Sequence, residues 1–259
     1  MKYLIPLLIS IVTINHIYSQ ELSDITTDRP DQSESSSTVP HKTLQIETGF
    51  VWQGDKTTTA ETRNLDIFNT LFRYGLLNNF ELRVGVNYAD VNVSPVNGSE
   101  DTTLRGFVPL AVGTKIMITK QNGFIPEISM LGTVTVPNTG SKDLDILNLA
   151  SDFRFALGWA ITDRISAGGN IGAQWNTVVP GGSGFYSAVV GISILSWMNG
   201  FVELYGWLPE YNLPDHRFDA GLTFPVKKNL QFDVSGGVGL SEISPDYFVN
   251  AGVAWRIPR

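Results

Sequence analysis

The stretch Tyr247-Phe248-Val249-Asn250-Ala251-Gly252-Val253-Ala254-Trp255-Arg256-Ile257 changes side-chain character at every second residue. Its even positions are mixed, small or polar (Phe248, Asn250, Gly252, Ala254, Arg256), whereas its odd positions are apolar throughout (Tyr247, Val249, Ala251, Val253, Trp255, Ile257). A period of two is the pattern of a β-strand with two different faces. Its length is that of a tilted strand crossing a bilayer, roughly nine to eleven residues.

The same alternation returns throughout the chain from Thr43 onward, for example in residues 80–88, 153–159 and 230–238. Short polar connections alternate with longer ones. The short ones are 75–79, 119–123, 162–164, 196–200 and 225–229, and the long ones are 53–63, 91–105, 136–145, 176–184, 209–215 and 239–246. Short turns at one end and long loops at the other are typical of bacterial membrane barrels, and these breaks delimit about twelve strands. We therefore predict an all-β fold, a transmembrane antiparallel up-and-down β-barrel.

Composition agrees with a wall that has one lipid face and one wet face. Charged residues make up only 17% of the chain, which carries 25 glycines and an aromatic content of 11%. There are no cysteines, so disulfides and thiolate metal sites are excluded. The formal net charge of −7 argues against nucleic acid as a partner. Aromatic residues also lie near strand ends, where membrane barrels place their interfacial girdles.

The first residues have the form of a secretory signal. Lys2 precedes an apolar stretch from Leu4 to Ile14, and Ile17-Tyr18-Ser19 follows with small and aliphatic side chains before Gln20. No later stretch has the eighteen or so apolar residues that a membrane helix needs. We expect a signal peptide in 1–19, an N-terminal periplasmic or plug segment in 20–42 and the barrel in 43–259. The predicted location is the outer membrane, with outer-membrane lipid as a partner.

Strand parity directs a set of charged side chains into the lumen. They are Glu47, Arg73, Glu81, Arg83, Lys115, Glu127, Asp152, Arg154, Glu203, Arg217, Asp219, Asp233 and Arg256. Ionised groups inside a barrel must be paired or hydrated, because an unpaired buried charge is costly. Two interpretations remain open: a lattice of ion pairs that stiffens the wall, and a charged constriction that selects what passes. Inward aromatic residues Phe201, Tyr205 and Trp207 either pack there or contact a flat apolar solute.

Thr27-Asp28-Arg29-Pro30-Asp31, followed by a Ser-rich stretch and by Leu44-Gln45-Ile46-Glu47-Thr48-Gly49-Phe50, has a distinctive composition. This opening resembles that of the outer-membrane family named for the meta-pathway of phenol degradation. The resemblance extends over nearly the whole mature chain. It implies a barrel encoded near aromatic catabolism with a role as a transporter.

The same opening motif also suggests a docking element. Asp28, Arg29, Pro30 and Asp31 offer two carboxylates, a guanidinium that binds carboxylates bidentately and a fixed backbone angle. We expect this motif to dock inside the periplasmic mouth against the inward charges and to form a partial plug. The alternative is a solvated linker, which the low hydrophobicity of the segment would suit.

The C-terminal strand resembles the signal that the outer-membrane barrel assembly machinery reads. The resemblance rests on Asn250, Gly252, Trp255 and Ile257, although the chain continues to Pro258 and Arg259 where the signal usually stops on an aromatic residue. This pattern makes the assembly machinery an expected partner.

Enzymatic interpretations find little support. His216 has outward parity near the long-loop end of its strand, where Ser241 or Ser244 could approach it, but no nucleophile motif accompanies them. No metal, phosphate-loop or dinucleotide motif is present, so we expect no cofactor and no metal.

We therefore predict a non-enzymatic outer-membrane channel for passive passage of small solutes, aromatic or hydrophobic ones among them. About twelve strands fall between a filled barrel and an open pore, which favours a narrow passage. The alternative is a non-transporting structural or adhesive barrel whose long extracellular loops bind a partner.

Overall fold

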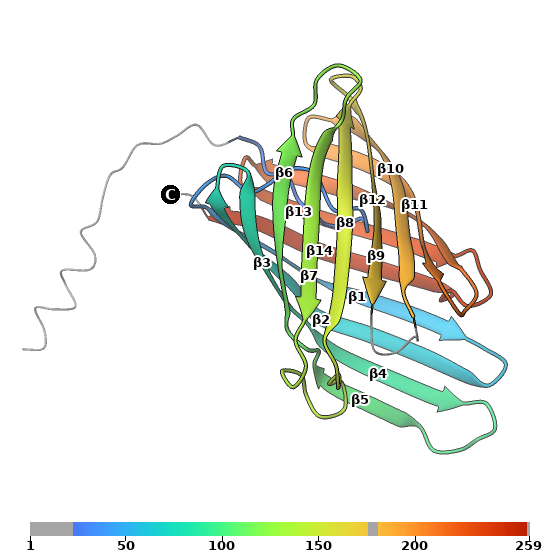
Figure 1. Cartoon of the computed structure of the whole chain (residues 1–259). Coiled ribbons are helices and arrows are strands. Elements are labelled where there is room, and N and C mark those ends of the chain that lie inside the picture. The colour runs from blue at the N-terminus through green and yellow to red at the C-terminus, as the bar shows by residue number, and fades with distance from the viewer. Residues whose placement is uncertain (1–22, 176–180, 258–259) are drawn as a thin grey trace, which may run out of the picture.

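The computed structural model describes residues 23–175 and 181–257, and these fold as one continuous antiparallel sheet (Figure 1). The predicted signal peptide lies outside the described residues. The strands are β1 (Leu44–Lys56), β2 (Ala60–Leu77), β3 (Phe80–Val86), β4 (Tyr88–Pro95), β5 (Thr102–Phe107), β6 (Ala111–Thr119), β7 (Glu127–Thr135), β8 (Ala150–Ala160), β9 (Ile165–Trp175), β10 (Ser183–Leu195), β11 (Met198–Pro209), β12 (Asp215–Lys227), β13 (Leu230–Gly239) and β14 (Tyr247–Ile257).

The sheet closes on itself. From β6 to β14 each strand pairs with the next, β14 pairs with β1, β1 with β2, β2 with β3 and β3 with β6. This closed ring holds twelve strands and confirms the predicted antiparallel barrel. Closure leaves the ring no edge, so the backbone groups of the wall are satisfied within the sheet, as a membrane span requires.

Strands β4 and β5 extend the wall beyond the ring. β4 pairs with the first half of β2, and β5 pairs with β4. In chain order β3 continues into β4 across Asn87, and β5 into β6 across residues 108–110, where Pro109 lacks the N–H that a ladder needs. Residues of the 136–149 connection bind at this break, with the Ser141 amide donating to the Phe107 carbonyl at 2.8 Å.

Alternation separates the two faces of the wall as predicted. On β11 the side chains of Val202 and Leu204 are 49% and 50% exposed, whereas Glu203 between them is 1% exposed. The exposed side is the apolar outer surface, and the covered side faces the lumen. Because the period is two, a slip of one residue would place the whole apolar set in the lumen, so the alternation also fixes the register.

Aromatic pairs lie at both rims of the outer surface. Trp52 meets Tyr247 edge to face at 5.7 Å near the long-loop end, and Trp197 stacks on Phe224 at 6.4 Å near the short-turn end. Amphipathic rings at these heights are typical of membrane barrels. Among the described residues there is no helix with the length and hydropathy of a membrane span.

The barrel interior is not empty. Residues 23–40, the lumen segment, enter at the short-turn end and run inside the wall before β1 begins (Figure 1, blue). The loop at 57–59 is shorter than the predicted 53–63, because β1 and β2 pair as far as Lys56 and Glu61.

Candidate functional site in the barrel lumen

The lumen segment crosses the barrel and returns. Its first residues lie beside β14 and β1, its middle reaches β10 and β11, and its end passes β7 and β3 before Pro40. It contains little regular structure, so the wall must satisfy its backbone. Amides of Asp28, Gln32, Glu34 and Val39 donate to wall side chains at 2.7–2.9 Å.

Asp28 lies at the centre of the strongest attachment. Its carboxylate contacts the Arg83 guanidinium at 2.6 Å, the Lys115 ammonium at 3.0 Å and the Arg73 guanidinium at 3.1 Å. It also accepts from the amide and hydroxyl of Ser35 at 2.9 and 2.7 Å. These side chains, with Glu34, Glu47 and Glu81, form what we call the Asp28 cluster.

The charge of the Asp28 cluster comes from both the wall and the segment. β1, β2, β3 and β6 supply three cations and the carboxylates Glu47 and Glu81, while the segment supplies the carboxylates Asp28 and Glu34. Burial disfavours the Asp28 carboxylate, but Arg73, Lys115 and Arg83 together hold its pKa well below the usual range. Without Asp28, three fully or nearly buried cations would lose an anion that they share.

Arg29 docks on the neighbouring wall strands β1, β14 and β13, over two glycines. Gly49 on β1 and Gly252 on β14 are register partners, and a Cβ atom on either would overlap the Arg29 guanidinium. The guanidinium donates to Asp233 on β13 at 3.0 Å and to the Asn250 side chain. Only residues without a side chain leave room for this contact, so both glycines are required by close approach.

The tip of the segment binds β11. The Gln32 amide and the Ser33 hydroxyl donate to the Glu203 carboxylate at 2.7 and 2.5 Å. Glu203 is paired in register with Asp219 on β12, and both side chains are essentially buried. Burial, and next the negative charge of Glu203, raise the pKa of Asp31 well above its usual range. The tip therefore rests on an acidic part of the wall.

The Ser-rich stretch is a set of wall contacts and not a linker. Ser36 and Ser37 hydroxyls donate to Glu127 at 2.9 and 2.7 Å, and Ser129 donates to the Ser36 carbonyl. The Val39 amide donates to Glu81 at 2.7 Å. Each hydroxyl meets an acceptor that a longer side chain would push away, so short polar residues suit this path.

The remaining predicted lumen charges are Asp152, Arg154, Arg217 and Arg256, of which Arg256 contacts the first described residue of the lumen segment. Arg154 pairs with Asp152 at 3.0 Å and covers the Phe185 ring at 3.8 Å. Arg217 pairs with Asp215 at 2.6 Å and lies 4.9 Å from the Trp207 ring, toward the long-loop end. Arg256, near the short-turn end, donates to backbone carbonyls of residues 23 and 228. Strand parity predicts an inward direction for all four of these side chains.

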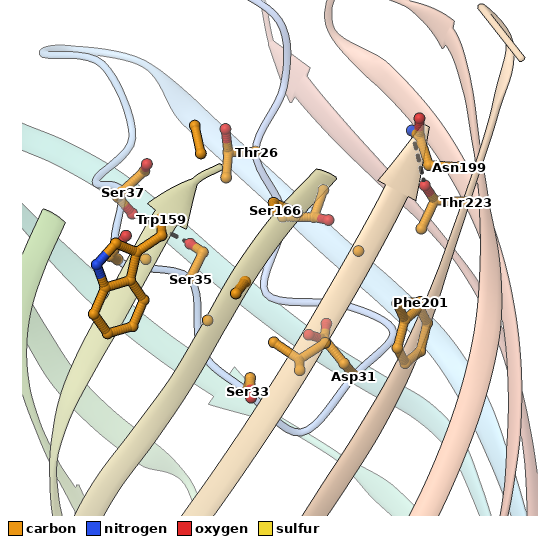
Figure 2. Close-up of a pocket in the computed structure, with 18 of the residues that line it drawn as sticks. Thr26, Asp31, Ser33, Ser35, Ser37, Trp159, Ser166, Asn199, Phe201 and Thr223 are labelled. Atoms are coloured by element: carbon orange, nitrogen blue, oxygen red, sulfur yellow. Dashed lines mark hydrogen bonds between the residues drawn. The ribbon is translucent and has the colours of Figure 1, made fainter. Parts of the chain in front are cut away.

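A cavity of about 640 Å³ remains between the lumen segment and strands β8–β12 (Figure 2). Thr26, Asp31, Ser33, Ser35 and Ser37 line it from the segment. Ser166, Asn199, Phe201 and Thr223 line it from the wall, with Gly158, Gly168, Gly191 and Gly200 between them. The wall side of the cavity carries many glycine, serine and threonine residues together with the rings of Trp159 and Phe201, and its charged residues are Glu127, Asp163 and Arg164.

Several residues that hold the lumen segment were given another role, or none, by the sequence analysis. Asn250 and Gly252, predicted as part of an assembly signal, also hold Arg29, and Ser187 and Asn170 bind the segment without having been singled out. Parity placed Asn250 and Gly252 on the same face of the last strand as Arg256, but it could not show what they contact.

The imidazole ring of His216 is hydrogen-bonded to Tyr186 and not to Ser241 or Ser244, the two serines that the sequence analysis considered. The Nδ1 atom of His216 lies 2.7 Å from the Tyr186 hydroxyl. Ser241 accepts from the His216 backbone amide, and Ser244 donates to Asp215 and to the His216 carbonyl. These hydrogen bonds of the two serines go to backbone groups and to Asp215 and not to the imidazole ring. Residues 23–175 and 181–257 contain no group of three potential metal ligands suited to an ion.

Comparisons with known proteins agree with this architecture. A family model described as "Putative MetA-pathway of phenol degradation" matches residues 27–257. No curated protein sequence matches the chain.

Solved structures share the fold at low identity. An outer-membrane channel from Pseudomonas putida F1 is similar with a TM-score of 0.67 and 12% identity, over 90% of this chain and 100% of that one. The KdgM porin is similar with a TM-score of 0.55 and 14% sequence identity, over 82% of this chain and 98% of the porin. The translocator domain of the autotransporter NalP from Neisseria meningitidis is similar with a TM-score of 0.56 and 10% sequence identity, over 83% of this chain and 89% of that domain. These likenesses show a barrel fold.

Proposed function

We propose that this chain, which belongs to the family described as the putative MetA-pathway of phenol degradation, is an outer-membrane channel for passive passage of small solutes. The lumen segment narrows the barrel at its periplasmic end. Solutes pass beside the segment, along the wall formed by β8–β12.

The observation that carries this proposal is the unequal division of the lumen. The segment binds the charged wall of β1–β3 and β6 through buried ion pairs, but toward β8–β12 it leaves a cavity of about 640 Å³. A sealed structural barrel would gain by filling this space with side chains, as small barrels do. Here glycines and serines keep it open.

The lining indicates the class of solute. Serine and threonine hydroxyls and the Asn199 amide offer hydrogen bonds without charge, and Phe201 offers a large apolar ring. Of the charged residues in the lining, Arg29 and Glu34 are paired with Asp233 and Arg83, and Glu127 accepts hydrogen bonds from Ser36 and Ser37. Asp31, Asp163 and Arg164 are the other charged lining residues. Small neutral molecules with one apolar and one polar side, phenols among them, match this lining and the description of the family. The channel from Pseudomonas putida F1 supports a transport role by analogy of fold.

Location and assembly belong to the same proposal. Outer-membrane lipid surrounds the apolar outer face, and the C-terminal strand with Trp255 and Ile257 is the segment that the assembly machinery would recognise. Replacing Trp255 with Ala tests this, since reduced insertion with an unchanged fold of the inserted fraction is expected.

Solute flux tests the channel itself. The purified protein is reconstituted in liposomes, and uptake of phenol is compared with uptake of a sugar of similar size. We expect phenol uptake above that of protein-free liposomes, and a rise in the uptake of both solutes when residues 23–38 are deleted, because the segment no longer occupies the lumen.

A matched control replaces Lys142, an exposed residue of a long loop, with Ala and should leave both fluxes unchanged. Absence of flux through the intact protein and through the deletion variant would overturn the proposal in favour of a structural barrel. Equal rates for phenol and sugar would retain the channel and reject the assigned solute class.

A further inference from the structure

Beneath the tip of the lumen segment lies an acid pair, Glu203 and Asp219, with which no cation of residues 23–175 and 181–257 forms an ion pair. The two are register partners on β11 and β12, so their Cβ atoms are about 5 Å apart. Their relative exposures are 1% and 0%. Among the described residues neither forms an ion pair, and both carboxyl oxygens of Asp219 lack a hydrogen-bond partner.

The neighbours of the acid pair do not supply positive charge. Asp31 faces it from the segment and Tyr205 from β11. Arg217, two residues from Asp219, is occupied by Asp215, and Arg29 is occupied by Asp233 on β13. On its β13 side Asp219 meets Gly237, which the Phe248 ring also approaches. An apolar and acidic surrounding does not tolerate two adjacent carboxylates.

One proton resolves this arrangement. Two neighbouring buried carboxyls can share a single proton, because repulsion between like charges makes ionisation of both unfavourable while they stay buried together. Glu203 already accepts from the Gln32 amide and the Ser33 hydroxyl, as an ionised carboxylate does. A protonated Asp219 would give Glu203 a third donor and would satisfy its own otherwise unpartnered carboxyl group.

We propose that Glu203 and Asp219 form a buried proton-binding site that holds the tip of the lumen segment against the wall. At higher pH the proton leaves to bulk water, both carboxyls are ionised, and their mutual repulsion together with that of Asp31 drives residues 31–33 from β11. Since Asp31 and Ser33 line the cavity, their release widens it. This last step rests on the proposed channel function; the proton site itself does not.

Cysteine labelling tests the site directly, because the chain contains no cysteine. Gln32 is replaced with Cys, which keeps the backbone amide that binds Glu203. Labelling by a maleimide is followed at pH 6 and pH 9 in the full chain. The rate is divided by that of a Lys142→Cys protein at the same pH, which removes the titration of the thiol.

We expect the normalised rate to rise about tenfold from pH 6 to pH 9, equivalent to one unit of pKa difference between the docked and released states. In an Asp219→Asn background the amide still donates to Glu203 but does not titrate, so the rate should stay low at both values. In a Glu203→Gln background it should be high at both, because the charged acceptor of the tip is lost.

A flat rate in the Gln32→Cys protein, or an equal rise in the Asp219→Asn background, would overturn the proton site. Amide hydrogen exchange at residues 32 and 33 of the unsubstituted protein, corrected for the intrinsic pH dependence, provides the same comparison without a cysteine. Labelling that follows pH while phenol flux stays constant would support the proton site and contradict passage beside the segment.

Discussion

Two carboxylates three residues apart on the lumen segment have opposite surroundings. Asp28 contacts three cations of β2, β3 and β6, and its pKa is held well below the usual range in spite of burial. Asp31 faces Glu203 and Asp219 on β11 and β12, and burial and Glu203 raise its pKa well above that range. The comparison shows that one segment is anchored on one wall and held weakly at the other.

The anchored side gains from charge complementarity, whereas the tip depends on hydrogen bonds to the Glu203 carboxylate and to the Ser187 hydroxyl. Breaking a buried ion pair by removing one partner costs about 3–5 kcal/mol, and losing a hydrogen bond to a charged group about 1.5–3 kcal/mol. A segment attached in this way can change the width of the cavity at its tip while its base remains bound.

The largest effect should follow from Asp28→Asn. It removes the anion shared by Arg73, Arg83 and Lys115, so we expect exchange of the segment amides to accelerate on the order of a hundredfold, with higher conductance. Hydrogen exchange measured by mass spectrometry and single-channel recording check this. Asp24→Asn, on an exposed residue of the same segment, is the control. If the two variants behave alike, the Asp28 cluster does not anchor the segment.

Gly252→Ala should have the next largest effect. The added methyl group occupies the space of the Arg29 guanidinium, so the contact with Asp233 is lost. We expect a loss of about 2 kcal/mol of docking free energy, seen as faster exchange at residues 28–31. Gly132→Ala, where a Cβ meets nothing within 4 Å, is the matched control. Unchanged exchange in Gly252→Ala would mean that the glycine pair is not needed for docking.

A pH series should separate the two carboxylates. The lowered pKa of Asp28 means that its contribution to docking is complete above about pH 4 and falls away in stronger acid. The raised pKa of Asp31 has the opposite sign, so its contribution is present in acid and is lost as the pH rises through the raised value. Hydrogen-exchange protection factors of the Asp28 and Gln32 amides measure docking at the Asp28 cluster and at the tip, respectively. Parallel changes at the two amides would contradict the comparison.

Phe201→Ala should have the smallest effect on docking and a visible one on flux. Phe201 is the largest wall side chain in the cavity shown in Figure 2 apart from Trp159, and it lies close to the Gly221 backbone. We expect a few-fold increase in sugar uptake with little change in segment exchange. Liposome uptake checks it, with Phe218→Ala on the outer face as control. A change in exchange without a change in flux would assign Phe201 to packing alone.

The barrel itself could be predicted because its rule is local. Period-two alternation, as in Phe80 to Tyr88, and the contrast of short and long connections depend only on neighbouring residues. The same rule placed Glu203, Asp219 and the other charges on the lumen side. The sequence pattern did not reveal the strand breaks at Asn87 and Pro109, because the alternation of side chains continues across them. Alternation does not show which strand pairs with which.

The docking residues could be predicted only in part. The opening Asp28-Arg29-Pro30-Asp31 was recognised as a docking candidate from its chemistry, but its four residues were treated alike. The structure separates them, since Asp28 meets cations, Arg29 lies on Gly49 and Gly252, and Asp31 faces acids. No spacing in the sequence encodes which wall residue lies opposite a segment without regular structure.

By itself the sequence determined the barrel, the approximate number of strands in its closed ring and the two faces of the wall, because these follow from side-chain alternation along a single extended chain. Only the tertiary structure decided which charges meet. Closing the ring brings β14 beside β1 and β3 beside β6, and the lumen segment then contacts residues up to 233 positions away in the chain. Electrostatic and steric complementarity act through space, so the anchor at Asp28, the glycine pair under Arg29 and the acid pair beneath the tip exist only in the folded barrel.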